Sequence, residues 1–296
     1  METAEHIAAL RDEGNLLAEA AGRARRDAPV PTCPGWQVRD LVRHTGFVHR
    51  WATGYVVEQH QTWVGQVPEA EILASSPPGD GDLLAWFREG HARLVSALGD
   101  ADPAMRCWTF LTAPSPLGFW ARRQAHETTI HRVDAQLAAG AHADGLDPVA
   151  PSLAADGIDE LIMGFGGRTS KRGLRSDPPA WLAIHATDAD GDWLVRMGTD
   201  AAEVTRGPSP GHGGPARAGS AGDAAGLGGG PIGPDASGRG PSAAGRAFDG
   251  AGCELTGPAA DLYLFLWNRA GRDRLELTGD PRALDVWRQQ VRVRWS

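Results

Sequence analysis

The sequence has few of the features that would place it in several common classes of protein. Its three cysteines, Cys33, Cys107 and Cys253, are far apart and odd in number, so no disulfide framework is expected. No apolar run approaches the length that a transmembrane helix needs, and residues 1–10 lack the apolar core of a signal peptide. We therefore expect a cytoplasmic protein without a membrane-spanning segment.

Positive charge is scarce relative to negative charge. The formal net charge is -8 at pH 7, which argues against nucleic acid as a partner because such a partner requires a basic face. Lys171 is the only lysine among 29 Lys and Arg residues, and together with 39 glycines this bias is typical of a GC-rich bacterial genome. The 296 residues are enough for one large core or two modest ones.

The first half of the chain predicts four helices joined by loops. Between the first two helices, three prolines and a glycine at residues 28–35 interrupt any regular element. Four long helices of this kind favour an antiparallel bundle, an architecture that often builds metal sites from facing helices. Apolar residues recur at helical spacing over about 3–27, 36–59 and 81–98, and again from Trp120 to Leu137 in the helix that Pro116 opens.

After Gly140 the pattern changes to a mixture of helices and strands. Residues of about 207–245 are dominated by Gly, Pro, Ala and Ser, and we expect them to form a disordered insertion. The predicted fold is an antiparallel four-helix bundle, residues 1–141, followed by a small α+β domain, residues 142–296. The elements expected in that domain are helices at about 152–165, 258–267 and after 280, a hairpin of strands 181–187 and 193–197, and extended segments at 253–256 and 275–278.

Glu127 and His131 are the residues with the clearest chemical potential. They are four positions apart on the last helix of the bundle, so they lie on one face, and that face is partly inward. His44 falls on the inward stripe of the second helix and is the candidate third ligand. Two imidazoles and one carboxylate form a set that zinc accepts, with a fourth position left open. The alternatives are a salt bridge between Glu127 and His131 and a core histidine at position 44.

Three further residues bear on this site. Asp134, about one turn beyond His131, can accept a hydrogen bond from a ligand imidazole; the alternative is a surface carboxylate paired with an arginine. His49 and His126 are other candidate ligands, but His126 lies about 100° around the helix from Glu127.

Two motifs carry a resemblance to a known family. Residues 31–36 (PTCPGW) with 40–44 (DLVRH), and residues 127–134 (ETTIHRVD), resemble the N-terminal signature of the mycothiol-dependent maleylpyruvate isomerase family. Residues 261–269 and 277–281 resemble the C-terminal domain of that family. The resemblance implies a DinB-like four-helix bundle and a small α+β domain similar to sterol-carrier-protein folds. It covers nearly the whole chain except the Gly-rich insertion.

On this resemblance, His44, Glu127 and His131 are the metal ligands, and the metal is a divalent ion, usually zinc. The ion holds the thiol of mycothiol as a thiolate, which adds to a cis double bond of the substrate; rotation and elimination then give the trans product. Arg269 would hold a substrate carboxylate, although a helix C-terminal arginine that interacts with the helix dipole is the alternative. Asn268 departs from the family pattern, where we expect a small residue.

The resemblance also sets the partners and the competing functions. The partners are mycothiol and a small electrophilic substrate, and the chain is expected to be a monomer or a weak homodimer. An isomerase of the maleylpyruvate type is the leading hypothesis. A mycothiol S-transferase of detoxification or secondary metabolism, and a non-catalytic metal- or thiol-binding protein, remain alternatives.

Overall fold

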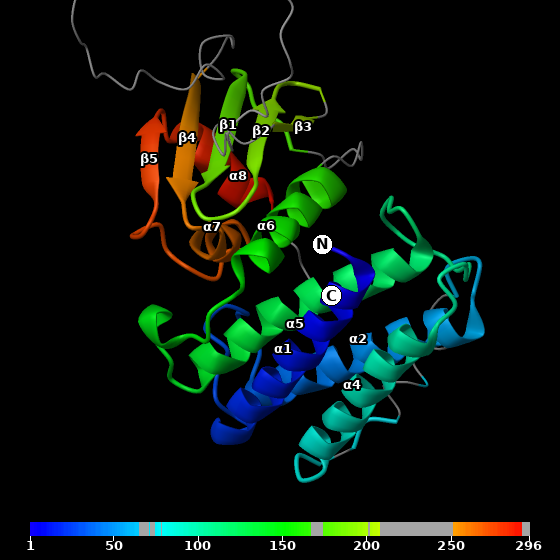
Figure 1. Ribbon diagram of the computed structural model, residues 1–296. Coiled ribbons are helices and arrows are strands. Elements are labelled where there is room, and N and C mark those ends of the chain that lie inside the picture. The colour runs from blue at the N-terminus through cyan, green and yellow to red at the C-terminus, as the bar shows by residue number, and fades with distance from the viewer. Residues whose placement is uncertain are drawn as a thin grey trace, which may run out of the picture.

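The structure, a computed structural model, describes residues 1–64, 71, 75–77, 79–166, 174–200, 202–207 and 251–291. The predicted insertion at about 207–245 lies outside these residues except for Gly207. The predicted four-helix bundle is confirmed, with α1 packed against α4 and α5 and α2 packed against the same two helices (Figure 1). Its helices are α1 Thr3–Arg23, α2 Val38–Glu58, α4 Leu83–Asp100 and α5 Pro116–Ala138.

Local capping fixes the starts of the two helices that carry the candidate ligands. At the start of α5 the Ser115 side chain accepts a hydrogen bond from the backbone N–H of Gly118 at 3.0 Å, and Pro116 occupies the first turn. At the start of α2 the Asp40 carboxylate accepts from the backbone N–H of Gln37 at 2.9 Å. Because each cap satisfies a backbone donor that the helix cannot, both helices begin at a defined residue.

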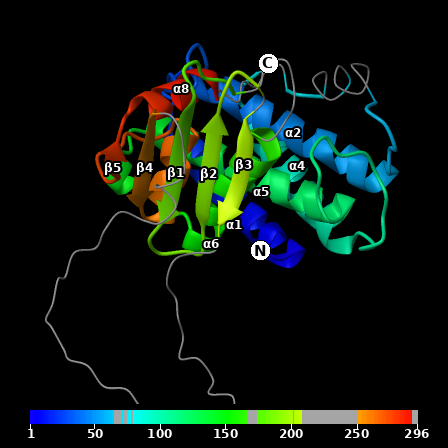
Figure 2. The same ribbon diagram turned by 90° about the horizontal axis from the view of Figure 1, so that it is seen from above.

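The second part of the chain is a mixed sheet with helices. The strand order is β3-β2-β1-β4-β5, with β3 and β5 at opposite edges (Figure 2). The β1–β2 hairpin was predicted, whereas β3 was not. The elements are α6 Pro151–Asp159, a π-helical segment Glu160–Gly166, β1 Ala180–Ala186, β2 Asp192–Met197, β3 Glu203–Gly207, β4 Ala251–Gly257, α7 Ala259–Leu266, β5 Glu276–Gly279 and α8 Arg282–Gln290, after a short 3-10 turn Ala143–Gly145.

The bundle and the sheet part share one hydrophobic core. A single cluster of buried side chains runs from Trp120 and Ile130 of α5 through Ile158 of α6 to Tyr263 and Phe265 of α7. Helix α6 packs against α7, and α7 and α8 pack against β4 (Figure 1). Among the described residues, no helix is both long and apolar enough to cross a membrane. The shared core holds the segment after α7 in a fixed position relative to α5, which matters for the site below.

Candidate metal centre

The three predicted ligands lie together, although they come from two helices. Nε2 of His44 on α2 lies 3.1 Å from Oε1 of Glu127 on α5. Nε2 of His131, one turn further along α5, lies 3.2 Å from the same carboxylate oxygen. One ligand atom from each of these residues can be chosen so that all three lie within 4.8 Å of one another. Two imidazole nitrogens and one carboxylate oxygen therefore face a common point.

This donor set fits a divalent metal ion. Nitrogen and oxygen donors of these types suit zinc, and three protein ligands leave a fourth position open for a ligand with a thiol or an oxygen. Nδ1 of His131 lies 2.9 Å from Oδ2 of Asp134. A contact of this kind fixes the ring and directs the other nitrogen, Nε2, toward the ion, as is usual for metal-bound histidines. Asp134 thus lies where the sequence predicted, behind His131.

The electrostatics keep both carboxylates ionised. Burial by itself raises the pKa of Glu127, but hydrogen bonds from His131 and His44 and the charge of Arg123 outweigh it and lower that pKa. For Asp134, burial is likewise outweighed by the charge of Arg269 and by the hydrogen bond with His131, so its pKa is also lowered. Both carboxylates are therefore ionised at neutral pH, which is the form in which the Glu127 oxygen can bind a cation.

The pKa values of His44 and His131 are shifted in opposite directions by their surroundings. Burial lowers the pKa of His44, against the hydrogen bond with Glu127. Burial also acts on His131, but its hydrogen bonds to Asp134 and Glu127 prevail and raise its pKa. The neutral form that a metal requires is thus favoured at His44 in the protein as it stands.

An arginine that sequence reasoning missed lies behind Glu127. Nη2 of Arg123 lies 3.1 Å from Oε2 of Glu127, whereas the distances to the two imidazoles given above are to Oε1. Arg123 also makes a short hydrogen bond to Glu160 in the π-helical segment, and its side chain is 2% exposed. Its position four residues before Glu127 was the available signal, since residues at that spacing share a helix face.

Arg269, the residue predicted to hold a substrate carboxylate, lies against Asp134. Its Nε is 2.9 Å from Oδ1 and its Nη2 is 2.9 Å from Oδ2, while Nη1 donates to the carbonyl of Trp267 at 2.8 Å. Thr32 also donates a short hydrogen bond to Asp134, and Sγ of Cys33 lies 3.4 Å from Oδ2. The carboxylate of Asp134 is therefore a meeting point of α5, the 28–37 loop and the segment after α7.

The 28–37 loop, which contains the PTCPGW motif, also places an aromatic ring beside the candidate ligands. The Trp36 ring lies 4.9 Å from the His44 ring and 6.1 Å from the His131 ring, centroid to centroid, and is nearly parallel to the latter. The side chain of His44 is 17% exposed, whereas those of Glu127 and His131 are 1% and 0% exposed. Solvent therefore reaches the ligand set from the side of His44.

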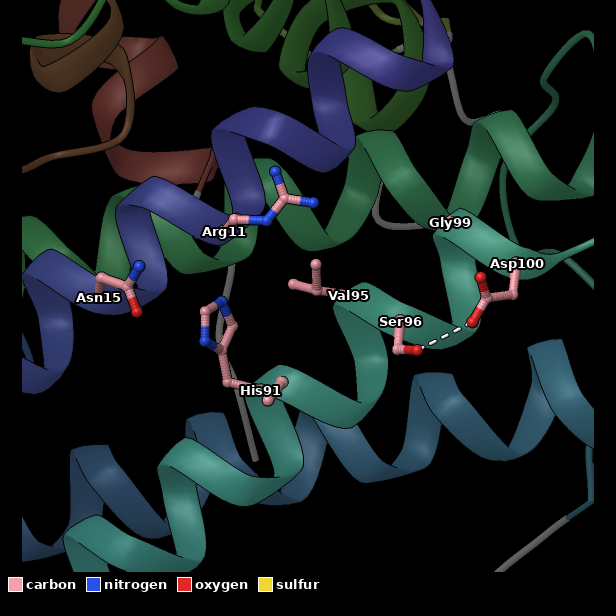
Figure 3. A pocket seen from close by; sticks show the side chains of 8 residues that line it. Arg11, Asn15, His91, Val95, Ser96, Gly99 and Asp100 are labelled. Atoms are coloured by element: carbon pink, nitrogen blue, oxygen red, sulfur yellow. Dashed lines mark hydrogen bonds between the residues drawn. The ribbon is translucent and has the colours of Figure 1, made fainter.

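The remaining histidines of the bundle have other contacts. Nε2 of His49 lies 2.9 Å from Oγ1 of Thr128, and Nε2 of His126 lies 2.8 Å from Oδ1 of Asp156. His91 donates to the carbonyl of Leu10 at 3.0 Å if Nε2 carries the proton, and its ring borders a surface pocket of about 460 Å³ between α1 and α4 (Figure 3). His49 and His126 are thus not part of the His44 set.

Comparison with known proteins matches both parts of the chain to one family. Residues 7–136 match the family model described as the mycothiol maleylpyruvate isomerase N-terminal domain, and residues 152–285 match the model of the C-terminal domain of the same family. No curated protein matches the chain in sequence.

Two solved structures share the fold. A crystal structure of the mycothiol-dependent maleylpyruvate isomerase is 13% identical in sequence, with a TM-score of 0.55, and the match covers 94% of this chain and 93% of that one. A structure of a histidine-to-alanine mutant of the isomerase gives a TM-score of 0.54 at the same identity and coverage. At this identity the likeness establishes the arrangement of helices and strands.

Proposed function

Because the chain belongs to the mycothiol maleylpyruvate isomerase family, we propose that it is a metal-dependent enzyme that uses mycothiol to isomerise a small electrophilic substrate about a cis double bond. The metal ligands in this proposal are His44, Glu127 and His131. A divalent ion bound there, zinc in the first instance, would supply the positive charge that holds a thiol as thiolate near neutral pH.

The observation that carries the proposal is the convergence of two imidazoles on one carboxylate oxygen. Nε2 of His44 and Nε2 of His131 lie 3.1 and 3.2 Å from Oε1 of Glu127. Arg123 holds the other oxygen of that carboxylate, so the ligand oxygen has a fixed direction. An arrangement that only stabilised the bundle would not need a solvent-accessible side, yet the His44 side chain is 17% exposed.

The side chains around the set have separate roles in this proposal. Asp134 holds His131 through Nδ1. Trp36 forms a wall beside both imidazoles and excludes water from one side of the set. Burial and the charge of Asp134 raise the pKa of Cys33 to about 12, so this thiol stays protonated at neutral pH. In this proposal the nucleophilic thiol is that of mycothiol.

A turnover assay with mycothiol distinguishes the proposed reaction from its alternatives. The protein, reconstituted with zinc, is incubated with mycothiol and maleylpyruvate, and the cis and trans products are separated by chromatography. Trans product that forms only when mycothiol is present supports the isomerase. A stable adduct with an electrophile panel indicates a thiol transferase, and binding of mycothiol without any product indicates a non-catalytic protein.

A further inference from the structure

We propose that Arg269 is a positioning residue, which acts through Asp134 on His131 and so makes metal affinity depend on the part of the chain after α7. This inference rests on the proposed function, since it concerns the same ligand set. It assigns to Arg269 a role other than direct contact with the substrate.

The geometry of Arg269 is that of a two-pronged carboxylate clamp. Nε and Nη2 each lie 2.9 Å from a different oxygen of Asp134, and the Arg269 side chain is 9% exposed. Paired contacts of this kind fix the plane and direction of the carboxylate as well as its charge. The third nitrogen, Nη1, is engaged by the carbonyl of Trp267. Both donors that could grip a substrate carboxylate side-on are thus already held by Asp134.

The backbone turn at the C-terminal end of α7 places Arg269 in this position. Asn268 adopts a left-handed conformation, with φ of 59°, and its N–H donates to the carbonyl of Phe265 at 3.0 Å. The N–H of Arg269 then donates to the carbonyl of Leu264 at 2.7 Å. These two bonds form the closing turn common at helix C-termini, where Asn is tolerated in place of glycine. The departure at Asn268 therefore has a structural explanation: it turns the chain so that Arg269 faces α5.

The contact between Arg269 and Asp134 affects the proposed metal ligands because Asp134 contacts His131. Oδ2 of Asp134 lies 2.9 Å from Nδ1 of His131, so the direction of this carboxylate sets the orientation of the ring and leaves Nε2 for the ion. Without Arg269, the buried carboxylate of Asp134 would keep only its contacts with Thr32, Cys33 and His131, and its plane would be less firmly held.

A second group of possible metal ligands lies beside Arg269. Cys33, His131 and Asp134 also offer ligand atoms within 4.8 Å of one another, and they share His131 with the first set. The guanidinium of Arg269 lies against this cluster, with Nη2 3.7 Å from Sγ of Cys33. A fixed positive charge at that place disfavours a metal ion on the Nδ1 side of His131. The charge of Arg269 thereby favours binding of the ion at Nε2 of His131 over binding at Nδ1.

The test measures zinc affinity of the whole chain by competition with a chromophoric chelator, without any substrate. Arg269→Ala should weaken zinc binding about 10- to 100-fold, the range typical for loss of a group that orients a ligand. Asp134→Asn should weaken it by a similar factor, since the one amide oxygen cannot replace both carboxylate oxygens that His131 and Arg269 contact. The double variant should bind zinc no more weakly than the weaker single variant, because both changes break the same chain of contacts. The matched control is Arg274→Ala, which removes an exposed arginine of the same segment and should leave zinc affinity unchanged.

The outcomes separate this inference from its rivals. Unchanged zinc affinity in a folded Arg269→Ala protein, with a raised KM for a carboxylate substrate, would show that Arg269 binds substrate and would overturn the proposal. Additive losses in the double variant would also overturn it, since Arg269 would then act independently of Asp134. If Arg269→Ala does not fold, the isosteric Asp134→Asn protein decides: wild-type zinc affinity there contradicts the proposal. Failure of the wild-type chain to bind zinc would instead refute the proposed function.

Discussion

Nη2 of Arg123 lies 3.1 Å from Oε2 of Glu127, while the other oxygen of the same carboxylate faces His44 and His131. One oxygen of the Glu127 carboxylate thus contacts the Arg123 guanidinium, and the other oxygen faces the candidate metal position. Arg123 in turn is held by Glu160 from the π-helical segment that follows α6. The orientation of the Glu127 carboxylate, a candidate metal ligand, therefore depends on a buried network that reaches the sheet part of the chain.

Replacement of Arg123 by methionine tests this network. The change leaves Glu127 and Glu160 buried without their cation, and removal of one partner from a buried pair costs about 3–5 kcal/mol of unfolding free energy. Chemical denaturation followed by circular dichroism measures the loss. Arg25→Ala, which removes an exposed arginine paired with Asp27, is the control and should have little effect. A stability equal to wild type in Arg123→Met would show that the network is not what holds Glu127.

Gly157→Ala tests the packing between α6 and α7. A Cβ at this position would lie 2.3 Å from Cε2 of Tyr263 and 2.9 Å from Nδ1 of His126, so both rings would have to move. Overpacking of this kind typically costs about 1–3 kcal/mol. Gly99→Ala, also in a helix but with no atom within 4 Å of the added carbon, is the matched control and should be neutral or stabilising. Equal melting temperatures for the two variants would contradict the close packing described here.

Asp156 gives the fold an acid-sensitive contact. Burial by itself raises its pKa, but hydrogen bonds with His126 and His6 and the charge of Arg122 prevail and lower it. A lowered pKa means that the stabilisation is fully present above the unfolded-state pKa, about 3.9, and is lost as the pH falls below that value.

Asp156→Asn should therefore be less stable than wild type at neutral pH by about 1–3 kcal/mol, because three donors lose a charged partner. The difference between the two proteins should shrink as the pH falls below about 4. Urea denaturation at a series of pH values measures it. A difference that stays constant through that acid range would mean that the charge of Asp156 does not stabilise the fold.

The sequence predicted the bundle because its helices follow from apolar periodicity, whereas the metal ligand set stays a proposal. Glu127 and His131 share a face as soon as residues 116–138 form a helix, and His44 lies on the inward stripe of α2 by the same rule. The family resemblance then named these three residues as the set, and the structure places them together. The domain boundary at 141/142 stays a prediction.

What the sequence did not predict depends on contacts between distant segments. Strand β3 has mostly exposed side chains and only Val204 as an apolar residue, so its sequence shows no alternation. The parallel pairing of β1 with β4, in which Leu182 lies beside Cys253, joins residues on either side of residues 208–250. The clamp of Arg269 on Asp134 spans 135 positions and arises only when the shared core brings α7 against α5. A sequence motif could suggest that Arg269 matters, but not which group it holds.

The central claim is that His44, Glu127 and His131 hold one divalent ion on which thiol-dependent turnover relies. His44→Ala is the most informative change, since His44 alone comes from α2 and its loss leaves two ligands on one helix. The bundle should stay folded, because loss of one partly exposed polar contact typically costs about 1–3 kcal/mol. The thiol-dependent turnover rate of the His44→Ala protein should fall below that of the wild type.

The most direct measurement is the metal content of protein purified without chelator, determined by elemental analysis on wild type, His44→Ala and a triple alanine variant of the ligand set. Circular dichroism on the same samples verifies that each is folded. The account predicts about one zinc per wild-type chain, much less in His44→Ala and none in the triple variant, by the preference of such donor sets for zinc. Full retention of metal by a folded triple variant would contradict the account and place the metal centre elsewhere in the chain.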